Sequence, residues 1–120
     1  DAQDVCSNIY EKELFPFDVL ILGMGNDGHT ASLFPNNIKL KEALETTKGF
    51  CICMKPDTAP YERMSLTKTA ILSATNIYLH FEGVEKQDVY KKVLEGASSN
   101  DMPVSAILNQ DKKKIEVYYK

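Results

Sequence analysis

Two residue types that commonly carry out proton transfer stand two positions apart in this sequence, at Asp27 and His29, with only Gly28 between them. An imidazole has an ordinary pKa of about 6.5, so at neutral pH it is largely uncharged and able to accept a proton. From these residues alone three interpretations stay open: a ligand site, a turn that only connects two elements, and a purely structural histidine.

The elements around this pair are compatible with a ligand site and, equally, with a turn that only connects two elements. The apolar run Val19–Leu22 is typical of a buried parallel strand, and Gly23, Gly25 and Gly28 follow it at once. Three glycines within six positions indicate that the backbone turns sharply or lets a ligand come close. In open α/β sheets, ligands bind beyond the carboxyl ends of the strands, which is where this turn is predicted to lie.

The glycine spacing also matches the dinucleotide-binding pattern Gly-x-Gly-x-x-Gly, which is a weak signal by itself. That pattern is normally followed, about 20 residues on, by an acidic residue at the end of the next strand. Glu42 and Glu45 stand near that distance, but no clear strand separates them from the turn. A dinucleotide site is therefore disfavoured.

The stretch from Leu22 to Pro35, Leu-Gly-Met-Gly-Asn-Asp-Gly-His-Thr-Ala-Ser-Leu-Phe-Pro, closely resembles the signature of the 6-phosphogluconolactonase family. The related glucosamine-6-phosphate deaminases carry a similar Gly-x-Gly-x-Asp-Gly-His stretch, but they place a catalytic Glu five residues after the histidine, where this chain has Phe34. Weaker matches follow in order, at 55–56, 63–67, 83–86 and 103–108, so the resemblance spans nearly the whole chain.

The resemblance implies metal-independent, cofactor-free hydrolysis of 6-phospho-D-glucono-1,5-lactone to 6-phosphogluconate, a step of the pentose phosphate pathway. It gives His29 the role of general base, and of the acid that protonates the leaving ring oxygen. Asp27 either orients this imidazole and contacts the substrate or only holds an Asx-type turn. Ser32 lacks the glycine neighbours of a nucleophile elbow, so covalent serine catalysis is not expected.

Four further residues are carried over as substrate-binding: Gly25, Gly28, Arg63 and Lys86. Lys86 opens a predicted helix, where a cation opposes the helix dipole, so helix stability does not explain it. The matching lysine of the deaminase relatives binds the sugar phosphate. For Lys86 and for Arg63, a solvent-exposed surface side chain is the alternative.

Family members resemble a Rossmann-like fold and are considerably longer than this chain. We therefore expect residues 1–120 to form the carboxyl-terminal part of a single domain, whose missing amino-terminal half supplies a Gly/Ser-rich phosphate loop and further charged site residues. Two other functions stay open: a glucosamine-6-phosphate deaminase or isomerase-like enzyme, and a non-catalytic sugar-phosphate-binding fragment.

Hydrophobic periodicity and turn residues predict an α/β fold with a mainly parallel sheet flanked by helices. The expected helices are 1–14, 30–34, 38–44, 68–74 and 84–95, and the expected strands are 17–22, 49–54, 63–66, 76–81 and 115–119. A loop is expected at 55–60, and 103–108 is either helical or extended. A helix over 30–34 would place free N–H groups near Gly28 and His29, where an oxyanion could bind. His80 is expected to be structural or edge-exposed.

Composition excludes several classes. A net charge of −3 gives no reason to expect a nucleic-acid partner, and no apolar run approaches the length of a membrane span. The chain lacks a signal-peptide pattern, and a cytoplasmic location is expected. Cys6, Cys51 and Cys53 form no zinc-type spacing, so buried free thiols are predicted.

Overall fold

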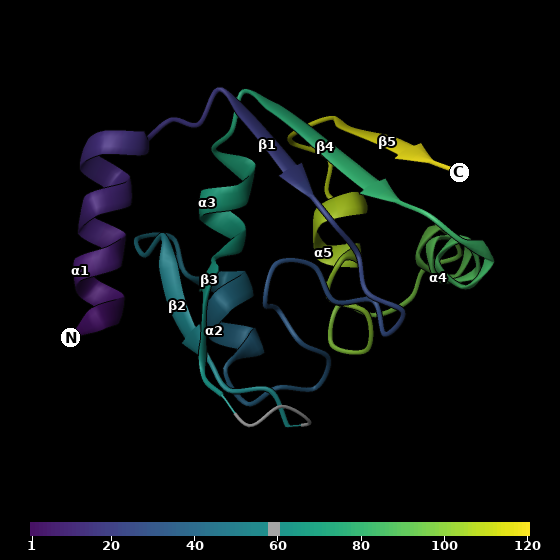
Figure 1. Ribbon diagram of the computed structural model, residues 1–120, viewed down its shortest axis with the longest axis horizontal. Coiled ribbons are helices and arrows are strands. Elements are labelled where there is room, and N and C mark those ends of the chain that lie inside the picture. Colours follow the sequence, from purple (N-terminus) through teal and green to yellow (C-terminus); the bar gives the residue numbers. More distant parts are fainter. Residues whose placement is uncertain (58–60) are drawn as a thin grey trace.

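The computed structural model of this chain describes residues 1–57 and 61–120, which alternate helices and strands as the periodicity predicts (Figure 1). The predicted loop at 55–60 therefore falls in part, at 58–60, outside the described residues. The helices are α1 Ala2–Ile9, continued by a π-helical turn η1 Tyr10–Leu14, then α2 Leu40–Glu45, α3 Lys68–Leu72, α4 Val84–Leu94 and α5 Ser105–Leu108. The strands are β1 Val19–Leu22, β2 Cys51–Met54, β3 Arg63–Leu66, β4 Asn76–Phe81 and β5 Ile115–Tyr119.

Three of the strands form a parallel sheet in the order β1-β4-β5. Leu79 in the central strand β4 pairs with Leu22 on one side and with Val117 on the other. Because all three strands are parallel, their carboxyl ends meet at one edge, next to the start of α4 (Figure 1). Chain segments that leave β1 and β4 are thereby brought close together.

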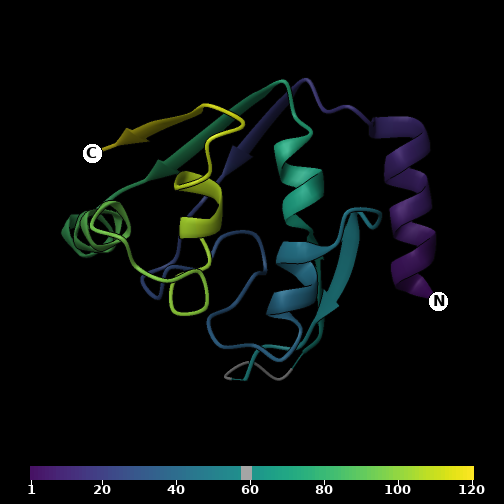
Figure 2. The same ribbon diagram turned by 180° about the vertical axis from the view of Figure 1, so that it is seen from behind.

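The two faces of this sheet differ in burial. Helices α3 and α5 lie on one side of the sheet (Figure 2), and Ile77, Leu79 and Phe81 of β4 are buried in the same core cluster as Ile71 of α3 and Ile107 of α5. On the opposite face Val19 is 56% exposed and Ile21 is 69% exposed. The prediction that the whole of Val19–Leu22 is buried is therefore wrong, since only Leu22 is buried and Leu20 is half-buried against the core. In the described part of the chain β1 is an edge strand, and nothing covers its outer face.

The core lies beneath the sheet and is closed by side chains from nearly every element. Its fully buried large members are Leu33, Leu40, Ile52, Met54, Ile71, Leu79, Val93, Val104 and Ile107. Burial of each such side chain is worth roughly 1.5–3 kcal/mol relative to exposure. Two helix ends are capped by residues that favour such positions: the Thr67 hydroxyl accepts the Ala70 N–H at 3.2 Å, and Gly96 follows α4 with a φ of +102°.

The strands β2 and β3 form a separate antiparallel hairpin, and α1 runs along its outer edge (Figure 1). The Cys51 N–H donates to the Ser7 hydroxyl at 2.9 Å, and the Cys53 N–H donates to Gln3 Oε1 at 2.9 Å. Gln3 and Ser7 are four residues apart on a helix, a rise of about 6 Å, which nearly equals the rise of two strand residues. The side chains of α1 therefore take the place of a third strand.

The predicted helix over 30–34 is wrong. These residues form a tight turn instead, in which the Leu33 N–H donates to the Thr30 carbonyl at 3.0 Å. Ala31 has a φ of +50° and Asn36 a φ of +56°, and left-handed residues at both places interrupt a right-handed helix. Leu33 is fully buried, so the turn is held by the core that its apolar side chain enters.

Candidate functional site

The glycine-rich turn leaves the carboxyl end of β1 and closes on itself. The Thr30 hydroxyl donates to the Gly23 carbonyl at 2.7 Å, which ties the two ends of the turn together. Across the turn, the Gly25 N–H donates to the His29 carbonyl at 2.9 Å, and the Gly28 N–H donates to the Gly25 carbonyl at 3.0 Å. Thr30 is fully buried, so the base of the turn is fixed by the core beneath it.

Asp27 and His29 are in direct contact. One carboxylate oxygen, Asp27 Oδ1, lies 2.6 Å from His29 Nδ1 and also accepts the His29 backbone N–H at 3.0 Å. Partial burial raises the pKa of Asp27, but the hydrogen bonds from the His29 backbone and imidazole outweigh it and hold that pKa below its ordinary value. An ionised carboxylate only accepts, so Nδ1 carries the proton and Nε2 is left as the basic nitrogen.

Two of the glycines make this contact sterically possible. A Cβ added at Gly25 would overlap the imidazole ring of His29 and lie 2.8 Å from Asp27 Oδ1. Gly28 has a φ of +85°, and a Cβ there would lie 2.8 Å from the Met102 side chain. Gly23, in contrast, has open space around its Cα.

The expected anion site at the backbone N–H groups of Gly28 and His29 is wrong. No helix begins there, and both groups already donate within the turn, to the Gly25 carbonyl and to Asp27 Oδ1. The glycines serve the turn by giving room to the imidazole and by allowing a left-handed backbone.

An aromatic ring, not singled out as a site residue from the sequence, supports the imidazole from one side. The Phe34 ring lies 5.0 Å from the His29 ring, centroid to centroid, at an interplanar angle of 40°. The Arg63 guanidinium carbon lies 5.7 Å from the centroid of the same Phe34 ring. The sequence feature that could have pointed to Phe34 is its position, because it stands where the deaminases have their catalytic Glu. Its contact with the His29 ring, however, depends on the turn at 30–33.

His29 opens into a pocket of about 400 Å³ that is lined by Gly23, Met24, Gly25, His29, Ala31 and Lys86. Lys86 comes from the first turn of α4, which follows β4, and therefore reaches the pocket from the neighbouring strand. The Asn26 side-chain amide donates to Glu85 Oε2 at 2.8 Å and ties the turn to α4. No local sequence pattern pointed to this contact, because it joins residues 59 positions apart.

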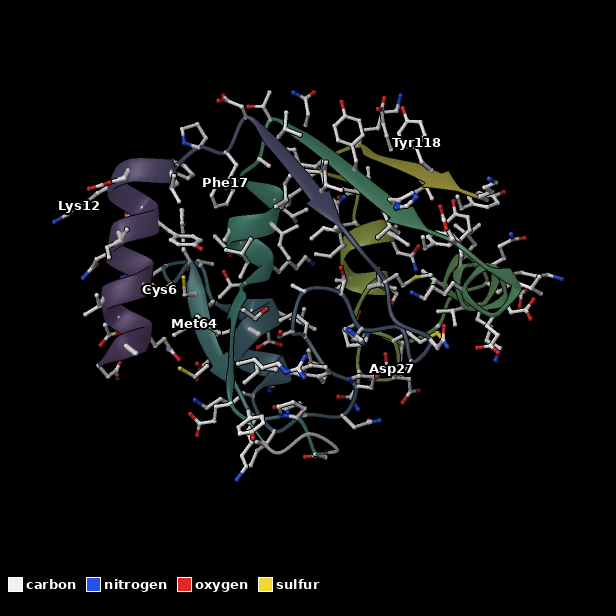
Figure 3. The ribbon with its side chains drawn as sticks, in the orientation of Figure 1. Cys6, Lys12, Phe17, Asp27, Met64 and Tyr118 are labelled. Carbon is white, nitrogen blue, oxygen red and sulfur yellow. The ribbon has the colours of Figure 1, made fainter. Side chains whose placement is uncertain are left out.

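The structure thus brings Gly25, His29 and Lys86 together in the pocket wall and places Asp27 behind them, in contact with His29. The other two predicted site residues also lie outside the pocket wall. Gly28 is buried against Met102, and Arg63 is exposed on β3, in contact with Phe34 (Figure 3 labels Asp27). Within residues 1–57 and 61–120 no three His, Cys, Asp or Glu side chains gather closely enough to hold a metal ion.

His80 lies apart from this pocket. It is exposed on the open face of β4, and its Nε2 lies 3.6 Å from Glu82 Oε1. His80 is therefore solvent-exposed, but on the face of the central strand and not, as expected for an exposed side chain there, at an edge of the sheet. Among the described helices, none combines the length and apolar character that crossing a membrane requires.

Comparison with known proteins shows the family of this chain. Residues 1–117 match the family described as glucosamine-6-phosphate isomerases/6-phosphogluconolactonase. A 6-phosphogluconolactonase of Neisseria meningitidis is 38% identical over 103 residues, which are 85% of this chain and 44% of the relative. A 6-phosphogluconolactonase of Helicobacter pylori is 40% identical over 99 residues, which are 82% of this chain and 42% of the relative.

The match to a solved structure covers more of the chain than these sequence matches do. A crystal structure of a 6-phosphogluconolactonase from Shewanella baltica superposes on 97% of this chain with a TM-score of 0.90 and 43% identity, and the chain covers 49% of it. The chain therefore spans less than half the length of these relatives. The α/β fold, with its parallel sheet flanked by helices, agrees with the family's fold. This chain belongs to the glucosamine-6-phosphate isomerase/6-phosphogluconolactonase family.

Proposed function

We propose that the protein to which this chain belongs hydrolyses 6-phospho-D-glucono-1,5-lactone to 6-phosphogluconate, as a step of the pentose phosphate pathway. The observation that carries this proposal is the Asp27–His29 contact of 2.6 Å at the wall of a pocket that Lys86 also lines. The relatives that are named 6-phosphogluconolactonase support it.

In the proposed reaction the Nε2 atom of His29 removes a proton from water while the water oxygen attacks the lactone carbonyl. The Asp27 carboxylate stabilises the imidazolium that forms and keeps its ring in place. When the tetrahedral intermediate collapses, the bond from the carbonyl carbon to the ring oxygen breaks, and the imidazolium returns its proton to that oxygen. The products are a carboxylic acid and a hydroxyl group, and His29 is neutral again.

The substrate would be held by charge and by close backbone approach. We propose that the Lys86 ammonium binds the phosphate group and that Arg63, beside Phe34, faces a negatively charged part of the substrate. Gly25 lines the pocket, so the substrate can approach its Cα closely. Gly28 is buried, and its proposed contribution to binding is the left-handed turn that presents His29.

We further propose that the remainder of the protein completes the same domain and covers the open face of the sheet. Val19 and Ile21 are apolar, exposed and adjacent to the site strand, and the chain accounts for 42–49% of the relatives' length. Residues 1–120 would then be the carboxyl-terminal part of one domain. The cytoplasm is the proposed location, in keeping with a pathway of soluble sugar phosphates.

Two alternatives make different predictions. A deaminase or isomerase of this family would need a carboxylate where this chain has Phe34, which disfavours that reading. A non-catalytic sugar-phosphate-binding protein would keep the pocket and Lys86 but would not need the basic nitrogen of His29.

The test is lactone hydrolysis by the full-length protein, corrected for spontaneous ring opening, with glucosamine 6-phosphate as a parallel substrate. We expect turnover of the lactone, loss of turnover in His29→Ala, and retained binding of 6-phosphogluconate by that variant. Binding without turnover in the folded wild-type protein would establish the binding-protein alternative, and release of ammonia from glucosamine 6-phosphate would establish the deaminase.

A further inference from the structure

Two cysteines that the proposed reaction does not use meet at the interface of α1 and β2. Cys6 Sγ and Cys51 Sγ lie 2.7 Å apart, although the residues are 45 positions apart in sequence. Figure 3 shows Cys6 on the side of α1 that faces the hairpin. A disulfide bond is about 2.05 Å long, so the two sulfur atoms need to approach by less than about 1 Å to reach bonding distance.

The neighbouring hydrogen bonds hold the two backbones at this spacing. Cys51 exchanges two hydrogen bonds with Ser7, the residue after Cys6: its N–H donates to the Ser7 hydroxyl at 2.9 Å, and its carbonyl accepts from that hydroxyl at 3.3 Å. One turn earlier in α1, Gln3 accepts the Cys53 N–H. The hydrogen bonds of Gln3 and Ser7, which flank Cys6 in α1, therefore hold Cys6 and Cys51 in contact.

We propose that Cys6 and Cys51 form an oxidative modification site, at which an oxidant of the peroxide class converts the two thiols into a disulfide that joins α1 to β2. This proposal is independent of the proposed lactone hydrolysis, since neither cysteine lies at the pocket.

The difference in solvent exposure between the two thiols determines which of them is oxidised first. Cys6 is half-buried and Cys51 is buried, so the oxidant meets Cys6 first. Its sulfur takes an oxygen atom from the peroxide to give a sulfenic acid, with release of one water. The Cys51 sulfur then attacks the Cys6 sulfur, the S–O bond breaks, and a second water leaves with the Cys51 proton.

Burial, and then the Cys6 side chain, raise the pKa of Cys51 to about 12. The resting form of Cys51 is therefore the neutral thiol, and a peroxide in solution should not oxidise it directly. Its reaction depends on an oxidised Cys6 being held against it, which favours the intramolecular link over other products.

The third cysteine provides an internal control. Cys53 also lies on β2, but its Sγ is directed to Met64 Sδ across the hairpin at 3.9 Å (Figure 3 labels Met64). The folded chain should therefore form one pairing out of the three that three cysteines allow. The link would close a long loop and tie α1 to the hairpin whose second strand, β3, carries Arg63.

The test treats the folded full-length protein with hydrogen peroxide, alkylates the remaining thiols and maps peptides by mass spectrometry. We expect loss of two hydrogen atoms, one linked pair of peptides holding Cys6 and Cys51, one alkylated thiol at Cys53, and full reversal by dithiothreitol. The thermal midpoint of the oxidised form should rise by more than about 5 °C. Cys53→Ser should form the same link, and Cys6→Ser and Cys51→Ser should form none.

A folded protein that keeps all three thiols, under conditions that oxidise an exposed cysteine in a reference protein, would overturn the proposal. So would a link that involves Cys53, or a mixture of pairings equal to that of the urea-unfolded chain. Circular dichroism of each variant, recorded before oxidation, separates a lost link from a lost fold.

Discussion

Two histidines of this chain each lie near a carboxylate two residues away in sequence, yet only one of them stands at a site. In the turn, His29 Nδ1 lies 2.6 Å from Asp27 Oδ1, and the His29 side chain is 33% exposed. On β4, His80 Nε2 lies 3.6 Å from Glu82 Oε1, and the His80 side chain is 57% exposed. The residue types are alike, and the difference lies in the backbone that presents them.

In an extended strand, residues two apart share a face and their side chains stand side by side in solvent. In the closed turn the backbone N–H of His29 also donates to Asp27, so one carboxylate oxygen holds both the main chain and the ring. Phe34 supports the imidazole from the side. A histidine–carboxylate pair by itself is therefore an ordinary feature of a protein surface. It becomes a candidate site where a turn fixes the orientation of the imidazole and its second nitrogen faces a pocket.

The largest expected effect separates the two histidines directly. In the full-length protein, His29→Ala should lower kcat for lactone hydrolysis by about 10²–10⁴-fold, because the general base is lost, and His80→Ala should stay within about twofold of wild type. Steady-state kinetics corrected for spontaneous hydrolysis measure both. If both variants lost kcat equally, the conclusion that only the His29–Asp27 pair takes part in catalysis would be wrong.

The second prediction concerns a substitution in the glycine-rich turn that leaves His29 itself unchanged. Gly25→Ala should lower kcat by at least about tenfold, because the new methyl group overlaps the His29 ring and displaces it from Asp27. Gly49→Ala is the matched control, since a Cβ there would meet its nearest neighbours at an ordinary 3.9 Å, the φ of Gly49 is not left-handed, and Gly49 lies outside the pocket. If both alanine variants behave alike, the close approach at Gly25 is not what presents the imidazole.

The third prediction concerns the ring that His80 lacks. Phe34→Leu should lower kcat several-fold, because an aromatic contact of this kind is worth about 0.5–1.5 kcal/mol. Phe34→Tyr keeps the ring and should retain kcat near the wild-type value. A pH–rate profile of each variant shows whether the altered step involves the His29 proton; an unchanged kcat in Phe34→Leu would rule out support from the ring.

The smallest expected effect is on stability. The pKa of folded Asp27 is lowered, so its contribution is present above the unfolded pKa, near 3.8, and is lost as the pH falls through the lower folded value. Asp27→Asn should therefore reduce the free energy of unfolding at pH 6–7 by less than about 1 kcal/mol, and the difference from wild type should vanish near pH 2. Urea unfolding at both pH values measures it; a pH-independent difference would contradict the assignment.

Most of the fold could be predicted because its signals are local. Hydrophobic periodicity over 76–81 and 84–95 predicted β4 and α4, and the structure has them at Asn76–Phe81 and Val84–Leu94. The predicted helix over 30–34 failed because long-range contacts decide that segment: Leu33 enters the core, and the Ser32 N–H donates to the Ser65 hydroxyl of β3 at 3.1 Å.

For the candidate site, the sequence predicted that Asp27, His29 and Lys86 would lie close together, but it predicted their geometry only in part. The spacing of Asp27 and His29 suggested an interaction without assuring contact, because contact depends on the φ of Gly28 and on the room left at Gly25. The run Val19–Leu22 predicted a buried strand, but burial also requires something to lie against it. No local pattern could show that Phe34 would lie beside the imidazole or that Arg63 would lie over the Phe34 ring.

The docking of α1 on β2 also bears on self-association. A strand edge with free N–H groups is a template on which another molecule can add its own strand, and such additions propagate into polymers. On β2 the N–H groups of Cys51 and Cys53 are already engaged by Ser7 and Gln3, so an incoming strand would find no donors there. Detachment of α1 would therefore do more than loosen the fold, because it would turn the hairpin into a seed for edge-to-edge aggregation.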